Sequence, residues 1–482
     1  MRILDTFYMD GVWVAPAPNP DGDATMPIMD PSTATRIGTL TLGSAQDVDR
    51  AVAAARRAFD TFSLTAKEER LRLLRALREQ TVARMPEMAE AISLEMGAPI
   101  TMSREVQAQS GLGHLDAFIA ALEASSEEEV LPNGDLLTRE PIGVCGLITP
   151  WNWPVNQIAL KVVPALATGA TCVLKPSEHT PLSAQLYAQM VHDAGYPAGV
   201  FNLVHGDGPT VGAALSRHPD VDMMSFTGST RAGRAVQIDA ADTIKRVTLE
   251  LGGKSPNLVF SDTGDDLPTR IAEGVTTCFA NTGQSCDAPT RMLVERDRYE
   301  EAIDLAVAAA AGQRVAAASE EGDHIGPLFD EIQYHRVQEL IQVGIDEGAR
   351  LLIGGLGRPE GLDAGWYVRP TIFADVTPDM RIWREEIFGP VLVMAPFDDE
   401  ADAIALANDT AYGLAAYVQT GDEQRARRVA RRLRAGQVNI NGRVADYGSP
   451  FGGFKQSGNG REGGIHGLED YQELKVQPPF TR

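Results

Sequence analysis

The N-terminal part of the chain has the spacing of amphipathic helices. Residues 44–62 carry apolar side chains three or four positions apart, which places them on one helical face: Val48, Val52, Ala55 and Phe59. Ser44 followed by Asp47 fits a capping box at the start of this helix. Thr65 followed by Glu68 predicts the start of a second helix directly afterwards.

From about residue 141 the pattern changes to short apolar runs that alternate with loops and helical stretches. The first series is GVCGLITP, ATCVLKP, FNLVHG, MMSFTGS, RVTLELGG and PNLVF, and a later series is TRMLVE, ARLLIGG, RPTIFADV, VLVMAPF and QVNING. Strands that alternate with helices predict βαβ units and parallel sheets, so the expected fold class is α/β. We place the boundary between two such domains near Gly252-Gly253, and the cleft between them is the expected ligand site.

Composition and charge narrow the possible partners. Of the 482 residues, 44% are hydrophobic and 23% charged, as in a soluble globular protein with a substantial core. The formal net charge of −23 opposes binding to nucleic acid or to an anionic membrane. No apolar run is long enough to span a bilayer, and the N-terminus lacks the apolar core of a signal peptide. Four cysteines without paired spacing, and eight histidines without HExxH, predict a reduced cytoplasmic protein with no metal.

One cysteine lies in a polar segment, the run NTGQSC that ends at Cys286. The other three, Cys145, Cys172 and Cys278, lie among apolar or small residues and are expected to belong to the core. A cysteine presented by a polar loop favours a nucleophile, whose reactive form is the thiolate. The pattern alone leaves open the alternative that Cys286 is a buried small hydrophobic residue.

Two polar residues that follow expected strands would suit such a nucleophile. Glu250 ends the run VTLE, and a carboxylate at the carboxyl end of a parallel strand faces the usual ligand side, where burial would make it a general base. Asn152 lies in a loop stiffened by Pro150 and Pro154, and a rigid amide suits an oxyanion hole. Each pattern is equally consistent with a structural role, as a salt-bridged acid or as an amide that binds loop backbone.

The signals for a dinucleotide are mixed. Glu178 follows an expected strand, where a carboxylate suits two ribose hydroxyls and would repel a 2′-phosphate, so it favours NAD over NADP. Gly458, Gly460 and Gly463 match GxGxxG, but no strand leads into them. The run GGKS is not the end of a phosphate loop, because Thr248 stands where the first glycine is required.

Taken together, these segments resemble the aldehyde dehydrogenase superfamily. Seven segments keep the family's order and approximate spacing over essentially the whole chain: TPWNWP (149–154), KPSE (175–178), FTGST (226–230), LELGGKSP (249–256), GQSC (283–286), EEIFGPV (385–391) and SPFGGFKQSGNGRE (449–462). Each segment on its own is common in proteins, but seven of them in this order and spacing are specific to the family. The resemblance implies a Rossmann-like NAD-binding domain, an α/β catalytic domain and a small β oligomerisation arm. It also explains the missing glycine fingerprint, because that family binds NAD across a modified Rossmann-like sheet.

The resemblance further implies how the chain is divided. The expected parts are an NAD-binding domain (1–122 and 142–251), a catalytic domain (252–440), oligomerisation or bridging segments (123–141 and 465–482) and a returning segment that lines the active site (441–464). The implied assembly is a homodimer or homotetramer.

By the same resemblance the protein is an NAD(P)-dependent aldehyde dehydrogenase (EC 1.2.1.-), with NAD preferred. Cys286 adds to the aldehyde carbonyl, and the Asn152 amide with the Cys286 backbone N–H holds the oxyanion of the thiohemiacetal. Hydride passes to the nicotinamide and leaves a thioester, which water activated by Glu250 releases as a carboxylic acid. Lys161 matches a lysine that the family places near the active site.

A set of cofactor contacts is implied as well. Lys175 and Glu178 would hold the adenosine ribose, while Glu386 would bind the nicotinamide ribose with Phe388 against the ring. The complete expected set is Thr149, Pro150, Trp151, Lys175, Ser177, Glu178, Gly208, Gly212, Phe226, Gly228, Ser229, Leu251, Glu386 and Phe388.

The chain departs from the family pattern beside the expected substrate mouth. Trp153 stands where the family often has Phe, and Asp287 follows the nucleophile where a small or apolar residue is common. A carboxylate that pointed inward would raise the pKa of the thiol. Alternatively, Asp287 shapes the mouth together with Trp153, Gln157 and Tyr447. Aromatic residues there favour an apolar or aromatic aldehyde, although the sequence does not identify it.

Three other functions fit the residues less well. A cysteine hydrolase built on Cys286 would need a histidine partner, and His205, His324 and His335 carry no recognisable signature. A CoA-acylating enzyme would pass the thioester to CoA, whereas Glu250 favours water as the acceptor. The intact set of expected catalytic residues opposes a non-catalytic binding protein.

Overall fold

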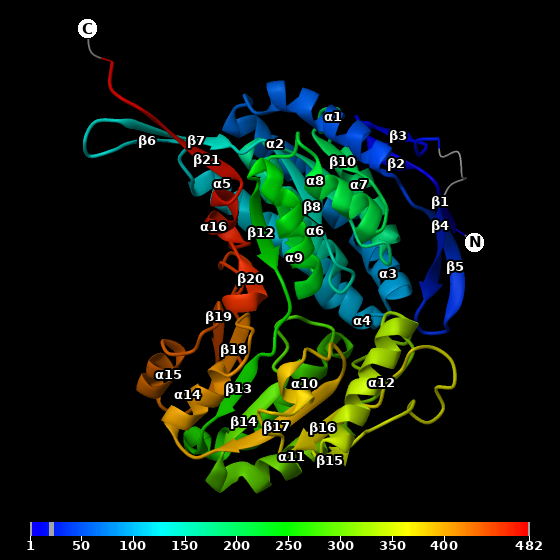
Figure 1. The fold of residues 1–482 in the computed structure, drawn as a ribbon, viewed down its shortest axis with the longest axis vertical. Helices are drawn as coiled ribbons and strands as arrows, with labels where there is room; N and C mark the ends of the chain where they lie inside the picture. The colour runs from blue at the N-terminus through cyan, green and yellow to red at the C-terminus, as the bar shows by residue number, and fades with distance from the viewer. Residues whose placement is uncertain (1, 19–23, 481–482) are drawn as a thin grey trace.

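The computed structural model describes residues 2–18 and 24–480. Residues 1, 19–23 and 481–482, which belong to the expected NAD-binding domain and oligomerisation segments, lie outside the described residues. Two large β-sheets with helices packed around them make up most of the molecule, one above the other in Figure 1. No helix in the described part of the chain is long and apolar enough to cross a membrane.

The upper sheet has a parallel centre with antiparallel edges. Its order is β20 (Gly458–Asn459), β12 (Arg246–Glu250), β11 (Met223–Thr227), β8 (Val144–Ile148), β9 (Thr171–Lys175), β10 (Phe201–Leu203), β2 (Phe7–Met9) and β3 (Val12–Val14). The five apolar runs expected between residues 141 and 251 are therefore all strands, β8 to β12. The match to GxGxxG begins at β20, which pairs antiparallel with β12 and leads into no helix directly.

The lower sheet is parallel except for its first pair. Its order is β15 (Arg350–Ile353), β16 (Thr371–Ala374), β17 (Val391–Phe397), β14 (Arg291–Glu295), β13 (Pro256–Val259), β18 (Ala415–Gln419) and β19 (Gln437–Ile440). Sequence analysis missed β18, because its run AAYVQ is short and rich in alanine and carries little strand signal.

Helices cover both sheets. The upper sheet is accompanied by α1 (Ala45–Phe62), α2 (Lys67–Ala83), α3 (Met85–Met96), α4 (Ile100–Met102), α5 (Ala108–Ala124), α6 (Pro154–Thr168), α7 (Pro181–Asp193), α8 (Ala213–Arg217), α9 (Thr230–Ala240) and α16 (Gly464–Glu469). The lower sheet is accompanied by α10 (Leu267–Phe279), α11 (Tyr299–Ala311), α12 (Glu331–Asp346), α13 (Arg381–Arg384), α14 (Glu400–Asn408) and α15 (Glu423–Ala430).

The helix starts were predicted with mixed success. The first helix is confirmed, and the Asp47 carboxylate accepts the backbone N–H of Ser44 at 2.9 Å as a capping box requires. The second prediction was wrong in detail, because α2 begins at Lys67 and Thr65 instead donates its hydroxyl to the carbonyl of Phe62 at 2.6 Å.

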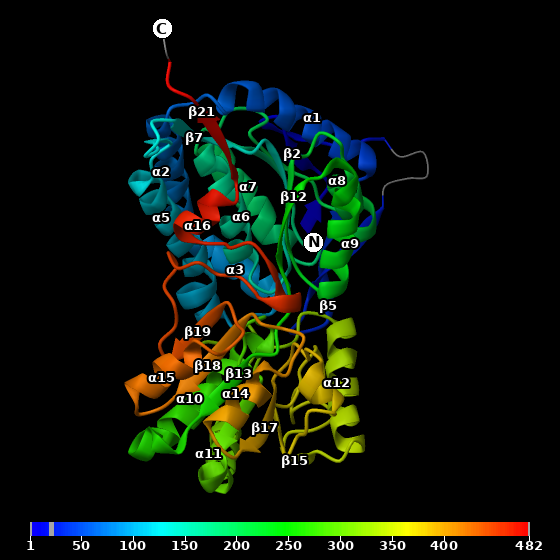
Figure 2. The same ribbon diagram turned by 60° about the vertical axis from the view of Figure 1, so that its left-hand side comes forward.

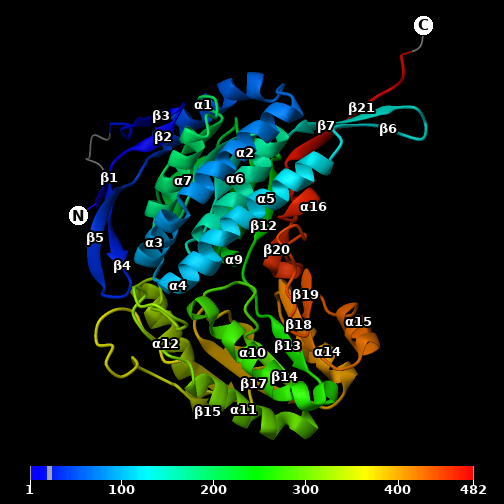
Figure 3. The same cartoon turned by 180° about the vertical axis from the view of Figure 1, so that it is seen from behind.

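Two small sheets complete the fold. One joins β1 (Arg2–Leu4), β5 (Thr35–Thr41) and β4 (Thr25–Asp30). The other joins β21 (Gln472–Gln477), β7 (Leu136–Pro141) and β6 (Glu128–Val130), and it projects from the molecule together with the C-terminal segment (Figures 1 and 3). This second sheet, called here the projecting sheet, is built from the two segments that were expected to bridge subunits: β6 and β7 overlap residues 123–141, and β21 lies within residues 465–482.

The junction between the two large sheets collects the functional candidates. The parallel strands of the upper sheet direct their carboxyl ends there, and β12 leads through Gly252-Gly253 into β13. The lower sheet contributes the loops that precede β14 and β17. The segment that contains β20 and α16 returns past the same junction (Figure 2). Loops from four separate parts of the chain therefore meet in one place.

Candidate active site

Cys286 lies in a tightly constrained loop between α10 and β14. The loop begins with a 3₁₀ turn (Ala280–Gly283) in which Asn281 and Thr282 have φ angles of 52° and 59°, values that are uncommon for residues other than glycine. At Gly283 a side chain would collide with the backbone that precedes β17. The main chain around Cys286 is therefore held in one conformation by its neighbours.

The surroundings of Cys286 make its thiol a weak acid. Burial raises the pKa of Cys286 well above its usual value, and the carboxylates of Asp287, Glu386 and Glu250 raise it further. Gly253 is required beside it, because any side chain there would strike the Cys286 carbonyl oxygen. The Asp287 carboxylate next to Cys286 therefore opposes ionisation of the thiol.

Asn152 is fixed against the loop of Cys286. Its side-chain Nδ2 donates to the carbonyl of Gln284 at 2.9 Å, and its own carbonyl accepts from the side chains of Gln107 at 3.1 Å and Asn281 at 2.9 Å. The Asn152 side chain is buried. An amide nitrogen has two N–H groups, so one remains available for an oxyanion in the cleft.

Glu250 ends β12 as a buried carboxylate, and neither of its oxygens has a hydrogen-bond partner among the described residues. Burial raises the pKa of Glu250 well above its usual value, Glu462 raises it further, and Lys161 opposes both effects. Lys161, buried on α6, forms an ion pair with Glu462 and donates to Ser225 Oγ at 3.2 Å. A buried carboxylate without partners is a strong base once it is ionised.

One cleft of about 770 Å³ connects these groups. It is lined by ten of the residues that the sequence predicted: Pro150, Trp151, Asn152, Gly228, Ser229, Glu250, Leu251, Cys286, Glu386 and Phe388. The histidines considered as hydrolase partners, His205, His324 and His335, do not line it. Within the described residues, no group of three or more His, Cys, Asp or Glu side chains could hold a metal ion.

The other predicted cofactor residues lie beside this cleft. Lys175 Nζ donates to the carbonyls of Pro176 and Gly206 at 2.9 and 2.6 Å and pairs with Glu178 at 3.0 Å. Burial raises the pKa of Glu178, but the Lys175 ammonium, hydrogen bonds to the carboxylate and the nearby His179 together outweigh burial, so the net pKa is lowered. Three more of these residues are placed as follows: the Thr149 backbone N–H donates to the Lys175 carbonyl, Ser177 is buried after β9, and Phe226 packs in the core under Gly228.

The cleft fits the phosphates and ribose of a dinucleotide. Gly208 and Gly212 bound a π-helical turn that precedes α8, and Gly212 approaches the Lys175 side chain. Ser229 caps α9, an 11-residue helix whose N-terminus faces the cleft, and the buried hydroxyl of Thr227 has no hydrogen-bond partner among the residues that the structure describes. A helix N-terminus beside a free hydroxyl group is a suitable site for a phosphate.

Two residues on α12 that the sequence analysis missed hold the far side of the cleft. Gln333 donates to the carbonyls of Ile387 and Phe388 at 3.0 and 2.8 Å, and Arg336 donates to the carbonyl of Glu386 at 2.9 Å. Burial raises the pKa of Glu386 to about 7. These residues carry no local sequence signal, because their partners are backbone atoms about 50 positions away.

The four residues expected at the substrate mouth, Trp153, Gln157, Asp287 and Tyr447, differ in burial and in their contacts with the nucleophile loop. Trp153 Nε1 donates to Ser285 Oγ at 2.9 Å, which links the start of α6 to the nucleophile loop. Gln157 is buried one turn later, and Tyr447 is 39% exposed on the returning segment. Burial raises the pKa of Asp287, whose backbone carbonyl accepts from the Tyr417 hydroxyl at 3.2 Å. Trp151 instead lines the cofactor cleft, stacked on Phe329.

Comparison with known proteins adds to this geometry. The model of the aldehyde dehydrogenase family matches residues 19–477. A 3-succinoylsemialdehyde-pyridine dehydrogenase of a Pseudomonas species is 50% identical over 477 residues, which cover 99% of this chain and 98% of the relative. An aldehyde dehydrogenase of Bartonella henselae has a TM-score of 0.96 at 48% identity, with 99% of each chain covered. A mutant aldehyde dehydrogenase C of Pseudomonas syringae, in complex with NAD⁺ and octanal, has a TM-score of 0.95 at 50% identity and covers 98% of this chain and 96% of that one.

Proposed function

The chain belongs to the aldehyde dehydrogenase family, and on that premise we propose how its residues carry out the NAD-dependent oxidation of an aldehyde to a carboxylic acid. The observation that supports the proposal most directly is that Cys286, Asn152 and Glu250 line one cleft, although they come from three separate segments of the chain. A nucleophile, an oxyanion donor and a base are the groups that this reaction requires.

In the first half of the reaction, the Cys286 thiolate attacks the aldehyde carbon and forms a tetrahedral thiohemiacetal. The free N–H of the Asn152 side chain and the backbone N–H of Cys286 stabilise the oxyanion. Donors that are already fixed in place cost little reorganisation at the moment of reaction, and loss of one typically reduces the rate by about 10²–10³. The hydrogen bond from Asn152 Nδ2 to the Gln284 carbonyl keeps the amide in that orientation, and Gln107 holds the Asn152 backbone carbonyl.

The cofactor supplies one chemical step: NAD, when bound, accepts the hydride of the thiohemiacetal and leaves a thioester on Cys286. We propose that Glu386, held by Arg336 and Gly253, binds one ribose, and that the N-terminus of α9 binds the phosphates. Lys175 and Glu178 would bind the second ribose, where the Glu178 carboxylate disfavours the 2′-phosphate of NADP.

Glu250 performs the second half of the reaction. Its unpartnered carboxylate removes a proton from water, and the hydroxide releases the acid from the thioester. Lys161 and Glu462 act through Glu250, because their opposite charges pull its pKa in opposite directions. They are therefore positioning residues that set the fraction of ionised base.

Two variants test this assignment against NADH production at 340 nm. Cys286→Ala should form no detectable NADH with any aldehyde. Glu250→Gln should still release one equivalent of NADH in a burst and then stall as an acyl-enzyme visible by intact mass, with turnover reduced by about 10² or more. Normal turnover by Cys286→Ala would refute the nucleophile, and normal turnover by Glu250→Gln would refute the base.

For the substrate we propose a class of aldehyde and no single compound. The relative named for a pyridine semialdehyde and the structure solved with octanal support an apolar or aromatic aldehyde that enters past Trp153, Gln157, Asp287 and Tyr447.

We propose that residues 123–141 and 465–482 form homodimers or homotetramers, in which β21 adds to another subunit's sheet. Four free cysteines are consistent with a reducing cytoplasm.

A further inference from the structure

Phe329 lies where the cofactor side of the cleft meets two catalytic loops. It stands two residues before α12, is half-buried and lines the cleft. One of the two loops is residues 149–153 between β8 and α6, called here the oxyanion loop, and the other is the nucleophile loop between α10 and β14. The Phe329 ring contacts the first loop, and the Phe329 backbone contacts the second.

The ring of Phe329 holds the oxyanion loop. It stacks on Trp151, with the centroids 3.6 Å apart and the planes at 21°, and Phe388 packs edge-on against the same indole at 5.5 Å. His179, beside the expected ribose contacts, packs edge-on against the Phe329 ring at 5.0 Å. Packed aromatic pairs stabilise a fold beyond the area that they bury. Because Trp151 directly precedes Asn152, the stack fixes the backbone that carries the oxyanion donor.

The backbone of Phe329 holds the nucleophile loop. Its N–H donates to Oε1 of Gln284 at 3.1 Å, and Nε2 of this buried amide donates to the carbonyl of Asn281 at 3.1 Å. The carbonyl of Gln284 accepts from Nδ2 of Asn152 at 2.9 Å. Gln284 therefore joins Phe329 to the oxyanion donor, two residues before Cys286.

Packing of the interior does not explain the place of Phe329. A ring that is half-exposed beside a cleft gains less from burial than a ring enclosed in a core. The exposed part of this ring forms wall of the cleft in which the dinucleotide is expected. The same side chain is thus positioned to contact the cofactor and to hold the oxyanion loop.

We propose, on the premise of the function above, that Phe329 is a positioning residue for both. Its ring and its N–H hold the oxyanion loop and the nucleophile loop together, and bound NAD packs against the same ring. Loss of the ring should therefore weaken NAD binding and also slow the attack on the aldehyde. Loss of the Gln284 side chain should slow the attack alone, because Gln284 is not among the residues that line the cleft.

The first experiment measures NAD affinity without turnover, by isothermal titration calorimetry in the absence of aldehyde. Phe329→Leu should raise the Kd of NAD by about twofold to tenfold, the value of a lost aromatic contact. Phe329→Tyr keeps the ring and should retain the parental Kd, as should Gln284→Met. An unchanged Kd in Phe329→Leu would overturn the proposal.

The second experiment measures NADH formation in a single turnover, with enzyme in excess over aldehyde and NAD saturating. Phe329→Leu and Gln284→Met should each slow it by about twofold to tenfold, because each removes one contact that holds the productive geometry. Phe329→Tyr should restore the parental rate. Parental rates in both Phe329→Leu and Gln284→Met would refute the positioning role.

The control is Tyr334→Leu, which removes an aromatic ring from α12 at a position that does not line the cleft. Tyr334 packs instead beside Trp366 and under the Arg358 guanidinium. This variant should keep the parental Kd of NAD and the parental single-turnover rate. If it changed both as much as Phe329→Leu does, the effect would be a general loosening of α12 and the proposal would fail.

The outcomes separate this inference from the function it rests on. If the unmodified enzyme forms NADH with no aldehyde, the proposed function fails, and the calorimetric comparison still decides whether Phe329 contacts the cofactor. If NADH forms and Phe329→Leu matches the parent in both experiments, only the role of Phe329 fails. Should Phe329→Leu not fold, as judged by thermal unfolding, Phe329→Met takes its place with the same expected results.

Discussion

At the scale of single residues, the charge balance around Glu250 controls the second half of the reaction. Glu462 raises the pKa of Glu250 and Lys161 lowers it, so removal of either should move the acid limb of the pH profile. Glu462→Gln should lower the pKa, because the ionised base then lacks a like charge beside it and Lys161 lacks its partner. Lys161→Met should raise the pKa for the opposite reason.

The measurement is thioester hydrolysis in a single turnover as a function of pH. Hydrolysis requires ionised Glu250, so the limb should shift to lower pH in Glu462→Gln and to higher pH in Lys161→Met. The wild-type enzyme lies between them. Shifts in the same direction would show that Glu250 is not the group that titrates.

Asp287 supports a second prediction at this scale. Its carboxylate adds to the effect of burial in raising the pKa of Cys286, so Asp287→Asn should lower that pKa. Each unit of decrease increases the thiolate fraction about tenfold below the pKa. Alkylation of the enzyme by iodoacetamide at neutral pH should therefore be faster than in the wild type.

The control for Asp287→Asn is Asp330→Asn, which makes the same change at a carboxyl group that lines the cleft but is not among the groups that raise the pKa of the Cys286 thiol. Its alkylation rate should match the wild type. The aldehyde preference of Asp287→Ala tests the other role suggested for this residue, because a change there would place its side chain at the mouth. Unaltered alkylation and preference would remove both roles.

The expected catalytic residues, which line the cleft together, all end or follow strands or stand in short ordered segments. Cys286, Glu250 and Asn152 each end or follow a recognisable run, and the resemblance to one family fixed their order. Glu462 lay inside a quoted segment without drawing attention, because its importance comes from the pairing with Lys161 about 300 positions away. Gln333 was missed for the same physical reason, because a helical residue gains its role from the segments that the fold brings next to it.

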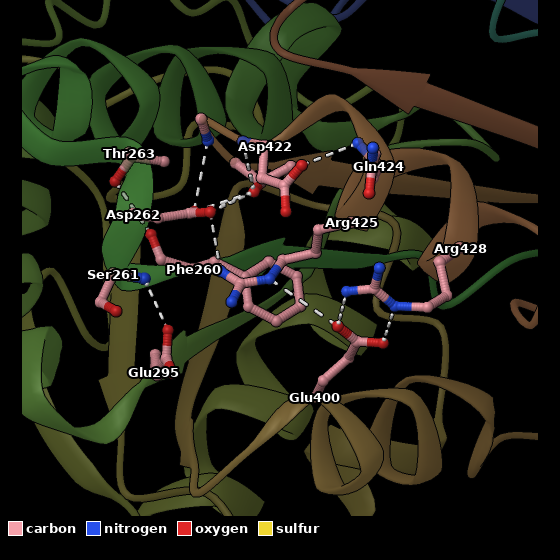
Figure 4. Close-up of polar contacts among 12 residues, drawn as sticks. Phe260, Ser261, Asp262, Thr263, Glu295, Glu400, Asp422, Gln424, Arg425 and Arg428 are labelled. Carbon is pink, nitrogen blue, oxygen red and sulfur yellow. Dashed lines mark hydrogen bonds and ion pairs between the residues drawn. The ribbon is translucent and has the colours of Figure 1, made fainter.

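At the scale of elements, α15 is anchored to the lower sheet by a polar network (Figure 4). Asp262 accepts from the Thr420 hydroxyl at 2.8 Å and pairs with Arg425 at 2.8 Å, while Glu400 on α14 pairs with Arg428 at 2.6 Å. The Arg425 guanidinium also lies over the Phe260 ring, 4.9 Å from its centroid. One carboxylate thus connects the end of β13, the end of β18 and α15.

Asp262→Ala should destabilise the protein by about 1–3 kcal/mol, because several donors lose a charged acceptor at a half-buried site. Chemical denaturation followed by circular dichroism measures the change. Glu423→Ala is the matched control, since its pair with Arg427 on the same helix is about 78% exposed and should contribute less than about 1 kcal/mol. Equal effects of the two substitutions would contradict an anchoring role for Asp262.

At the scale of the whole molecule, the arrangement of the two large sheets explains why the site forms where it does. The upper sheet presents strand ends to the junction, and the lower sheet presents the loops before its strands. The sequence predicted the α/β fold class, since alternation of strands and helices is a local signal. It could not predict the antiparallel pairings of β2 with β10 and of β20 with β12, because these pairings join segments that are distant in sequence.

The projecting sheet gives the last prediction. Leu474 and Val476 lie on the same face of β21, are 64% and 52% exposed, and sit on a strand paired on one edge only within the described residues. An exposed apolar strand with a free edge tends to pair with another chain. If this edge joins subunits, Leu474→Glu combined with Val476→Glu should lower the native mass to that of one 51.8 kDa chain, as measured by sedimentation or light scattering.

The control is Leu64→Glu, at an equally apolar exposed position between α1 and α2, which should leave the native mass unchanged. Retention of the parental mass by the double variant, or a parental enzyme that is already monomeric, would show that the projecting sheet does not hold subunits together.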